Sequence, residues 1–173
     1  MDLEAQLLHE HSRANCDVIV NWIGASQKKF DQLFHLFLHG KALVTQRAAW
    51  PLSYAVRQHP RFIDKHFSSL LDNLSRPGIH NAIRRNTMRL LQDMPIPEQY
   101  HGQVMDISFN YIMDPKEKVA VKAFSLTVLG NMLQQYPEIG PEIKLIIEDQ
   151  WEHQTAAFYS RAKKLLHQLE KKK

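Results

Sequence analysis

The stretch Phe30-Asp31-Gln32-Leu33-Phe34-His35-Leu36-Phe37 decides the fold class of this 173-residue chain. Its large apolar residues Phe30, Leu33, Phe34 and Phe37 are spaced i, i+3, i+4 and i+7, which places them on one face of a helix. The same spacing recurs in three further stripes: Ile63, Phe67, Leu70, Leu71 and Leu74; Tyr100, Val104, Ile107 and Tyr111; Ile143, Ile146, Ile147 and Trp151. No stretch of five or more residues alternates as a half-buried strand would, so we predict an all-α protein.

Turn residues separate the predicted helices. Gly24 followed by Ser26 is typical of a helix that ends on a glycine and a next helix that begins at a serine cap. Gly40, Pro95-Ile96-Pro97 and Gly140-Pro141 indicate further boundaries. We therefore expect about ten helices joined by short connections, with successive helices antiparallel.

Composition narrows the class of protein. Apolar residues make up 44% and charged residues 23%, both ordinary for a globular protein, and the length suggests a single domain. The single cysteine, Cys16, excludes an intramolecular disulfide and a cysteine-based zinc site. The apolar runs are far shorter than a membrane span, and the acidic start Met-Asp-Leu-Glu has no apolar core of a signal peptide. We expect a cytoplasmic protein without membrane contact.

An internal repeat places a basic residue early in the second helix of each helix pair. The five aligned basic residues are separated by 34, 37, 38 and 39 positions. They are Arg13, Arg47, Arg84, Lys122 and Arg161. A repeat of this length cannot bury its apolar face alone, so neighbouring repeats must stack. We expect one domain, residues 1–173, with repeats at approximately 1–25, 26–59, 60–94, 95–137 and 138–173, and a frayed lysine tail.

The fourth repeat resembles the HEAT-repeat family. Asp114 in the turn, Val121-Lys122-Ala123 and Val128-Leu129-Gly130 are similar to the family's turn aspartate and the helix that follows it. Asp114-Pro115 also predicts the start of that helix, whereas Pro51 should kink the second helix of its own pair. The resemblance implies an all-α, right-handed α-α superhelix, or solenoid, of about five antiparallel helix pairs. A compact irregular helical bundle is the alternative.

Charge is divided unequally between the two helices of the pairs. The presumed first helices carry a net charge of −9, and the second helices carry +13. In HEAT-like solenoids the second helices line the concave side, so the resemblance implies a basic concave surface. Its predicted residues are Arg47, Arg84, Arg85, Arg89, Lys122 and Arg161. The aligned cations also suit a structural ladder between repeats, whereas Arg85 and Arg89 lie outside the aligned position, on one helix face.

This surface predicts a non-catalytic scaffold that holds an acidic protein or peptide partner. A nucleic-acid-binding module is the alternative, because phosphates would also meet a basic face. The oligomeric state stays open.

Residues for catalysis or cofactor binding are sparse. His35 and His39 lie one helical turn apart, but no third ligand is near in the sequence, so we predict no metal site and no cofactor. Cys16 lies between apolar positions and is expected to be a small buried residue. A more remote resemblance links the fold to bacterial alkylpurine DNA glycosylases, which use an aspartate and aromatic residues in a basic cleft. No acid on a second helix has an evident partner in the sequence, so an enzyme is not expected, and a glycosylase-like enzyme is the least favoured of the alternatives.

Overall fold

The computed structural model describes residues 1–170, apart from the side chain of His153. Over this range the chain forms ten α-helices and four 3-10 helices, and it contains no strand. The all-α fold class predicted from the apolar spacing is therefore confirmed. The lysine tail at positions 171–173, which was expected to fray, lies outside the described residues.

The chain divides into two compact units, residues 1–94 and residues 95–173, here called the N-terminal unit and the C-terminal unit. The division falls at the position where the sequence predicts the boundary between the third and fourth repeats. The expected single domain of five repeats stays a prediction.

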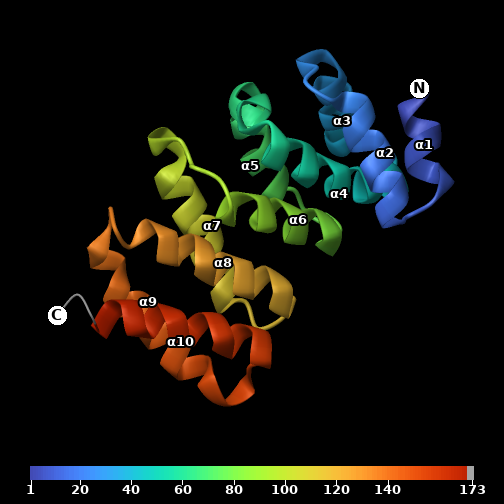
Figure 1. The fold of residues 1–173 in the computed structure, drawn as a ribbon. Helices are drawn as coiled ribbons and strands as arrows, with labels where there is room; N and C mark the ends of the chain where they lie inside the picture. Colours follow the sequence, from blue (N-terminus) through green and yellow to red (C-terminus); the bar gives the residue numbers. More distant parts are fainter. Residues whose placement is uncertain (171–173) are drawn as a thin grey trace. The chain divides into compact units, whose positions relative to one another are not determined.

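The N-terminal unit consists of three helix pairs (Figure 1). They are built from α1 (Leu3–His9), α2 (Arg13–Ile23), α3 (Gln27–His39), α4 (Ala42–Gln58), the 3-10 helix η1 (Pro60–His66), α5 (Phe67–Leu74) and α6 (Asn81–Gln92). The second helices α2, α4 and α6 follow one another, because α4 contacts both α2 and α6. Helix α4 also contacts α1, α3 and η1, so it is the central element of this unit.

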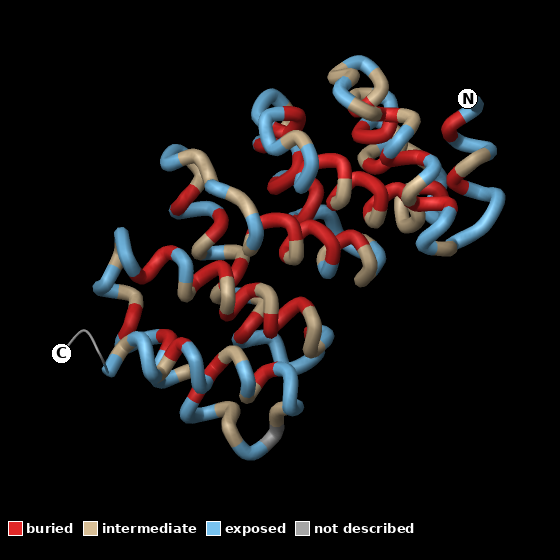
Figure 2. The backbone as a smooth tube through the Cα atoms, in the orientation of Figure 1, coloured by how far each residue is buried: buried red, intermediate tan, exposed pale blue. Residues whose placement is uncertain are grey.

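The apolar stripe of α3 forms the core of the N-terminal unit. Phe30, Leu33, Phe34 and Phe37 are all at most 2% exposed, as their spacing predicts. Figure 2 shows the buried residues on the sides of the helices that face their neighbours. The second stripe, at 63–74, is buried as well, but η1 and α5 share it instead of one continuous α-helix.

Local signals set the helix ends in this unit. Ser26 caps α3 by accepting a hydrogen bond from the backbone N–H of Lys29, and Gly24 ends α2 with a φ of 51°, a conformation that glycine adopts without strain. Pro51 lacks the N–H for one helical hydrogen bond, yet α4 continues through it to Gln58. The hydroxyl of Ser53 donates to the carbonyl of Trp50 next to the proline, at 2.8 Å.

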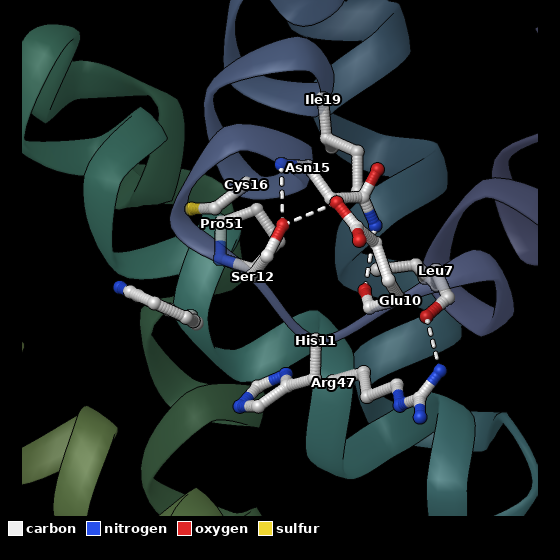
Figure 3. Close-up of a pocket in the computed structure, with 10 residues that line it drawn as sticks. Leu7, Glu10, His11, Ser12, Asn15, Cys16, Ile19, Arg47 and Pro51 are labelled. Carbon is white, nitrogen blue, oxygen red and sulfur yellow. Dashed lines mark hydrogen bonds between the residues drawn. The ribbon is translucent and has the colours of Figure 1, made fainter.

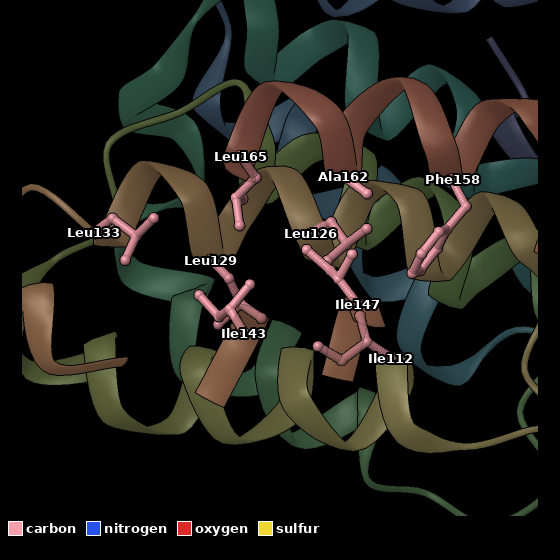
Figure 4. Packing of buried hydrophobic residues seen from close by; sticks show 9 residues of the cluster. All are labelled: Ile112, Leu126, Leu129, Leu133, Ile143, Ile147, Phe158, Ala162 and Leu165. Carbon is pink, nitrogen blue, oxygen red and sulfur yellow. The ribbon is translucent and has the colours of Figure 1, made fainter. Parts of the chain in front are cut away.

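The C-terminal unit has a core of its own. Its elements are η2 (Glu98–Tyr100), α7 (His101–Met113), α8 (Val119–Met132), η3 (Pro137–Ile139), α9 (Gly140–Gln150), η4 (Trp151–His153) and α10 (Ala156–Glu170). Side chains from α7, α8, α9 and α10 meet in one apolar cluster (Figure 4). Leu126 and Leu129 of α8 lie in this cluster with Ile147 of α9 and Phe158 of α10. Contacts of α8 with both α7 and α10 hold the unit together.

The helix start predicted at Asp114-Pro115 is wrong. Asp114 instead ends α7, and α8 begins at Val119 after a turn. The Asp114 carboxylate accepts a hydrogen bond from the backbone N–H of Lys116 at 2.8 Å, and its carbonyl accepts one from the N–H of Glu117. The aspartate therefore satisfies the turn between the helices and does not cap α8, because short polar side chains readily bond the backbone two residues on.

Candidate binding surface

The side chain of Tyr54 is the centre of a cluster of cations on the second helices of the N-terminal unit. The guanidinium carbon of Arg13 lies 4.3 Å from the centroid of the Tyr54 ring. Those of Arg57 and Arg89 lie 5.8 Å and 5.7 Å from the same centroid. The three arginines come from α2, α4 and α6, so one aromatic ring of α4 gathers charge from three successive second helices. Each contact has the geometry of a cation–π interaction.

The cations of this cluster differ in their carboxylate partners. The Nε of Arg13 donates to Asp17 at 2.9 Å, and Arg57 lies 3.9 Å from Asp93. Among the described residues, no carboxylate pairs with Arg89 or with Arg85, which precedes it by one helical turn on α6. The side of α6 that carries Arg85 and Arg89 therefore presents positive charge that the chain itself does not neutralise. Such charge attracts acidic groups of a partner.

The electrostatics of the cluster act on Tyr54 itself. Partial burial would raise the pKa of its hydroxyl, but hydrogen bonding with Trp50 and the positive charges of Arg13 and Arg89 outweigh it, so the pKa is lowered. The hydrogen bond that Arg13 donates to Asp17 raises the pKa of Arg13 above its already high value. The positive charges of Arg13 and Arg89 thus stabilise negative charge at the tyrosine.

Two further rings extend the cluster. The ring centroids of Trp50 and Tyr54, one turn apart on α4, are 6.5 Å apart, and the ring of His11 lies 5.2 Å from that of Trp50. Trp50 and Tyr54 therefore form a packing pair along one face of α4. Both rings are half-buried and belong to the surface around the arginines, however, and not to the core. Aromatic rings beside arginines are typical of the energetically important centres of protein interfaces.

Arg47 and Arg84, two of the predicted surface residues, are bound to the backbone of their own unit. Arg47 donates to the carbonyl of Leu7 at 3.2 Å, at the end of α1 (Figure 3). It also donates to the carbonyl of Leu8 at 2.8 Å. Arg84 donates to the carbonyl of Ile79, just before α6, at 3.3 Å. These hydrogen bonds satisfy carbonyls that the helix end and the turn leave without partners.

The other two predicted residues lie in the C-terminal unit. Lys122 is buried, with 3% of its surface exposed, and its ammonium donates to the side-chain oxygen of Gln150 at 3.2 Å. Burial lowers its pKa, although the charges of Asp114 and Glu117 act in the opposite direction. Because its charged end points into the unit, we leave Lys122 out of the candidate surface. Arg161 is half-buried over the ring of Phe124, at 5.2 Å.

Sequence reasoning missed Arg13, Tyr54 and Arg57 as binding residues. Arg13 is one of the five aligned basic residues, for which a structural role was an open alternative. Arg57 stands three positions after Tyr54, which puts the two side chains on one helix face. That spacing predicts the contact between Arg57 and Tyr54. Only the packing of α4 against α2 and α6 shows that the Tyr54 ring also contacts arginines of those two helices.

Other residue types with reactive chemistry lie at the edge of this surface or away from it. Cys16 is buried beside a cavity of about 10 Å³, room for roughly one water molecule, and burial raises the pKa of its thiol to about 11. The rings of His35 and His39 are 4.9 Å apart. Within residues 1–170 no three His, Cys, Asp or Glu side chains are grouped so that they could hold a metal ion. No helix in the same range is long and apolar enough to cross a membrane.

The antiparallel helix pairs and the repeated basic position define an all-α helical-repeat protein. The sequence matches the family model of the HEAT repeat domain over residues 3–169, nearly the whole chain. The chain therefore belongs to the HEAT repeat family, as its fourth repeat suggested. Neither a curated protein nor a solved structure gives a significant match. The more distant resemblance to DNA glycosylases stays a prediction.

Proposed function

We propose that this protein is a non-catalytic scaffold that holds an acidic protein partner on the second-helix surface of its N-terminal unit. Membership of the HEAT repeat family indicates a scaffold or protein-interaction role. The observation that carries the finer proposal is the convergence of Arg13, Arg57 and Arg89 on the ring of Tyr54. Arginines held in place by an aromatic ring lose little further entropy when they bind a carboxylate.

The distribution of charge supports the location of the proposed site. Eight of the nine arginines of the chain lie in residues 1–94. That segment has twelve Lys and Arg residues against eight Asp and Glu residues, whereas residues 95–173 have ten of each. The net positive charge of the protein therefore belongs to the unit that contains the tyrosine cluster. A partner with an acidic surface would be attracted to this unit first.

The acids within the cluster favour a protein partner over a nucleic acid. Asp17 and Asp93 lie beside Arg13 and Arg57, where they would repel a continuous row of phosphates. Separate carboxylates of a protein can be placed between these two acids, and arginine pairs with carboxylates through two parallel hydrogen bonds. Tyr, Trp and Arg are also the residues most enriched at the centres of protein interfaces.

A single-stranded nucleic acid is the second candidate. The half-buried rings of Trp50 and Tyr54, next to arginines, are the observation that favours it, because bases stack on such rings. Against it, the guanidinium of Arg13 already lies over the Tyr54 ring at 4.3 Å.

One experiment tests both candidates by fluorescence anisotropy at low and physiological salt. The probes are a fluorescein-labelled decaglutamate peptide and labelled single- and double-stranded DNA and RNA. The variant Arg85→Glu/Arg89→Glu reverses the unpaired charges of α6. The matched control, Lys28→Glu/Arg61→Glu, makes the same change in charge at two exposed residues of α3 and η1.

The proposal expects the decaglutamate peptide to bind the wild type and the control, and to lose at least about tenfold in affinity with the α6 variant. Binding of nucleic acid that is tighter than peptide binding and falls steeply with salt would instead establish the second candidate. If no probe binds, or if the control loses as much affinity as the α6 variant, the assignment of this surface is overturned.

A further inference from the structure

The C-terminal unit contains a hollow between α8 and α10 that no part of the proposed function uses. Its volume is about 110 Å³. The residues that line it are Leu126, Thr127, Gly130, Asn131, Arg161, Lys164, Leu165 and Gln168. For comparison, an apolar cavity of about 150 Å³ holds a benzene ring, so this hollow has room for a side chain of four or five heavy atoms.

Hydrogen bonds hold Arg161 in one orientation at this hollow. Its Nε donates to the hydroxyl of Thr127 at 3.1 Å, and that hydroxyl donates in turn to the carbonyl of Ala123 at 3.2 Å. The guanidinium also lies 5.2 Å from the centroid of the Phe124 ring. These contacts use the Nε and one face of the guanidinium, and they leave its two terminal nitrogens for another acceptor. A guanidinium fixed in this way is prepared to bind a carboxylate through two hydrogen bonds.

The charge around Arg161 is not neutralised within the unit. Among the described residues no carboxylate forms an ion pair with Arg161 or with Lys164. Lys164 is exposed and lies three positions after Arg161, on the same side of α10. Two cations thus stand at one hollow without an acidic partner of their own.

The floor of the hollow is apolar and shaped by a glycine. Leu126 and Leu165 are buried beneath it. A Cβ atom on Gly130 would lie 2.7 Å from Cδ1 of Leu165, so the missing side chain is what lets α8 and α10 come together here. An occupant should therefore offer an apolar group to the edge of Leu165 and the side-chain-free backbone of Gly130 and, close beside it, an anion to Arg161.

We propose that this hollow binds the C-terminal residue of a peptide that ends in an apolar side chain. The terminal carboxylate pairs with Arg161 and Lys164, and the apolar side chain lies against the edge of Leu165 and the backbone of Gly130. A terminal carboxylate is attached to the same carbon as the side chain, so both groups fit within one small site. The surface around Tyr54 is separate, because every residue of the hollow lies between positions 126 and 168.

NMR titration of the full chain tests this proposal. The probe is N-acetyl-leucine, which has both the carboxylate and the apolar side chain. N-acetyl-leucinamide lacks the carboxylate, and N-acetyl-glutamate amide has only a side-chain carboxylate. We expect N-acetyl-leucine to shift the amide signals of Thr127, Gly130 and Gln168 with a Kd of about 1–10 mM, the range for a ligand of this size. The two other probes should bind at least about fivefold more weakly.

Three variants locate the binding within the hollow. Arg161→Gln should weaken N-acetyl-leucine binding about tenfold or more, because it removes the guanidinium that donates two hydrogen bonds to the carboxylate. Thr127→Val keeps the arginine but removes the hydroxyl that orients it, so a smaller loss of about threefold to fivefold is expected. Lys163→Gln removes a neighbouring exposed cation of α10 that does not line the hollow, and it should change nothing.

Three results would overturn the assignment. They are equal shifts with the carboxylate and its amide, equal binding of N-acetyl-glutamate amide, and unchanged binding in Arg161→Gln. None of these results is obtained with the α6 variant Arg85→Glu/Arg89→Glu, which tests the surface around Tyr54. The failure of one site is therefore distinguishable from the failure of the other.

Discussion

The two units are built from the same kind of helix pair, but they place their basic side chains differently. On α6 of the N-terminal unit, Arg85 is exposed and Arg89 is half-buried against Tyr54, and neither has a carboxylate partner in the described part of the chain. On α8 of the C-terminal unit, Lys122 is buried and bound to Gln150. This difference in burial and bonding depends on whether the residue occupies the aligned basic position of its repeat. Every aligned basic residue donates a hydrogen bond within its own unit: Arg13, Arg47, Arg84, Lys122 and Arg161.

This comparison separates residues that hold the fold from residues that are available to a partner. A cation whose hydrogen bonds end on its own unit stabilises that unit, and its removal should be seen in unfolding. Arg13 and Arg161 combine both roles, because each uses its Nε for the bond within its unit and keeps its terminal nitrogens for a partner. A cation without such bonds should matter little for stability and much for binding. The four predictions below test this distinction, starting with the largest effect.

Lys122→Ala should be the most destabilising of these changes. It removes a buried side chain and a hydrogen bond to Gln150, so we expect the free energy of unfolding to fall by about 2–3 kcal/mol. Urea denaturation followed by circular dichroism measures this change. Lys122→Met is the matched control, since it keeps the apolar stem and removes only the ammonium with its hydrogen bond to Gln150.

Burial already disfavours the charge of Lys122, so the Met variant should lose less than about 1 kcal/mol. If both variants lost the same stability, the ammonium and not the buried stem would hold α8 in place. If neither lost stability, Lys122 would not be a structural residue at all.

Acid pH should weaken a second anchored group, the carboxylate of Asp31 on α3. It accepts hydrogen bonds from Lys65 and His66, both at 2.7 Å, and from Gln27 at 2.9 Å. Partial burial acts to raise its pKa, but these three donors lower it from 3.8 to about 2. Because the folded pKa is the lower one, Asp31 stabilises the fold fully above pH of about 4, and this contribution is lost as the pH falls toward 2.

The contribution of Asp31 is expected to be about 1–2 kcal/mol, allowing for partial solvent screening. Asp31→Asn should therefore unfold more easily than the wild type at pH 7 and approach it at pH 2, as measured by thermal melts across this range. A constant difference between the two proteins at all pH values would show that the charge of Asp31 is not what holds Lys65 and His66.

Arg47→Ala should cost about 1–2 kcal/mol, because it leaves two carbonyls at the end of α1 without their donor. Hydrogen exchange should accelerate in α1 before it does in α3. Arg85→Ala is the control from the other class of cation, and it should change stability by less than about 0.5 kcal/mol. Equal losses in the two variants would remove the distinction between anchored and available arginines in this unit.

Much of the fold followed from the sequence, because helical spacing and helix caps are local signals. The stripe of Phe30 to Phe37 and the caps at Gly24 and Ser26 depend on residues a few positions apart. The start of α8 was misplaced because Asp114 suits both a helix cap and a turn, and only the path of the chain between α7 and α8 decides between them.

The candidate surface was harder than the fold to predict from the sequence. Whether a basic residue points outward or inward depends on helices that are distant in sequence. Lys122 meets Gln150, 28 positions away, and Arg47 meets carbonyls about 40 positions away. Arg85 and Arg89 are not among the five aligned basic residues. That was the one sequence feature that distinguished them from the cations bound within their own unit.

The smallest expected effect concerns Tyr54, where an aromatic ring and not a charge is tested. Tyr54→Leu removes the ring that Arg13, Arg57 and Arg89 share, and it should weaken decaglutamate binding about threefold to fivefold, as expected for an exposed cation–π interaction. Tyr54→Phe keeps the ring over which the guanidinium groups lie and removes only the hydroxyl that Arg13 and Arg89 also contact, so it should bind within about twofold of the wild type. Anisotropy titrations at one salt concentration compare the three proteins. If Phe were as damaging as Leu, the hydroxyl would be the group that positions Arg89, and the surface would depend on a hydrogen bond to Tyr54 instead of on its ring.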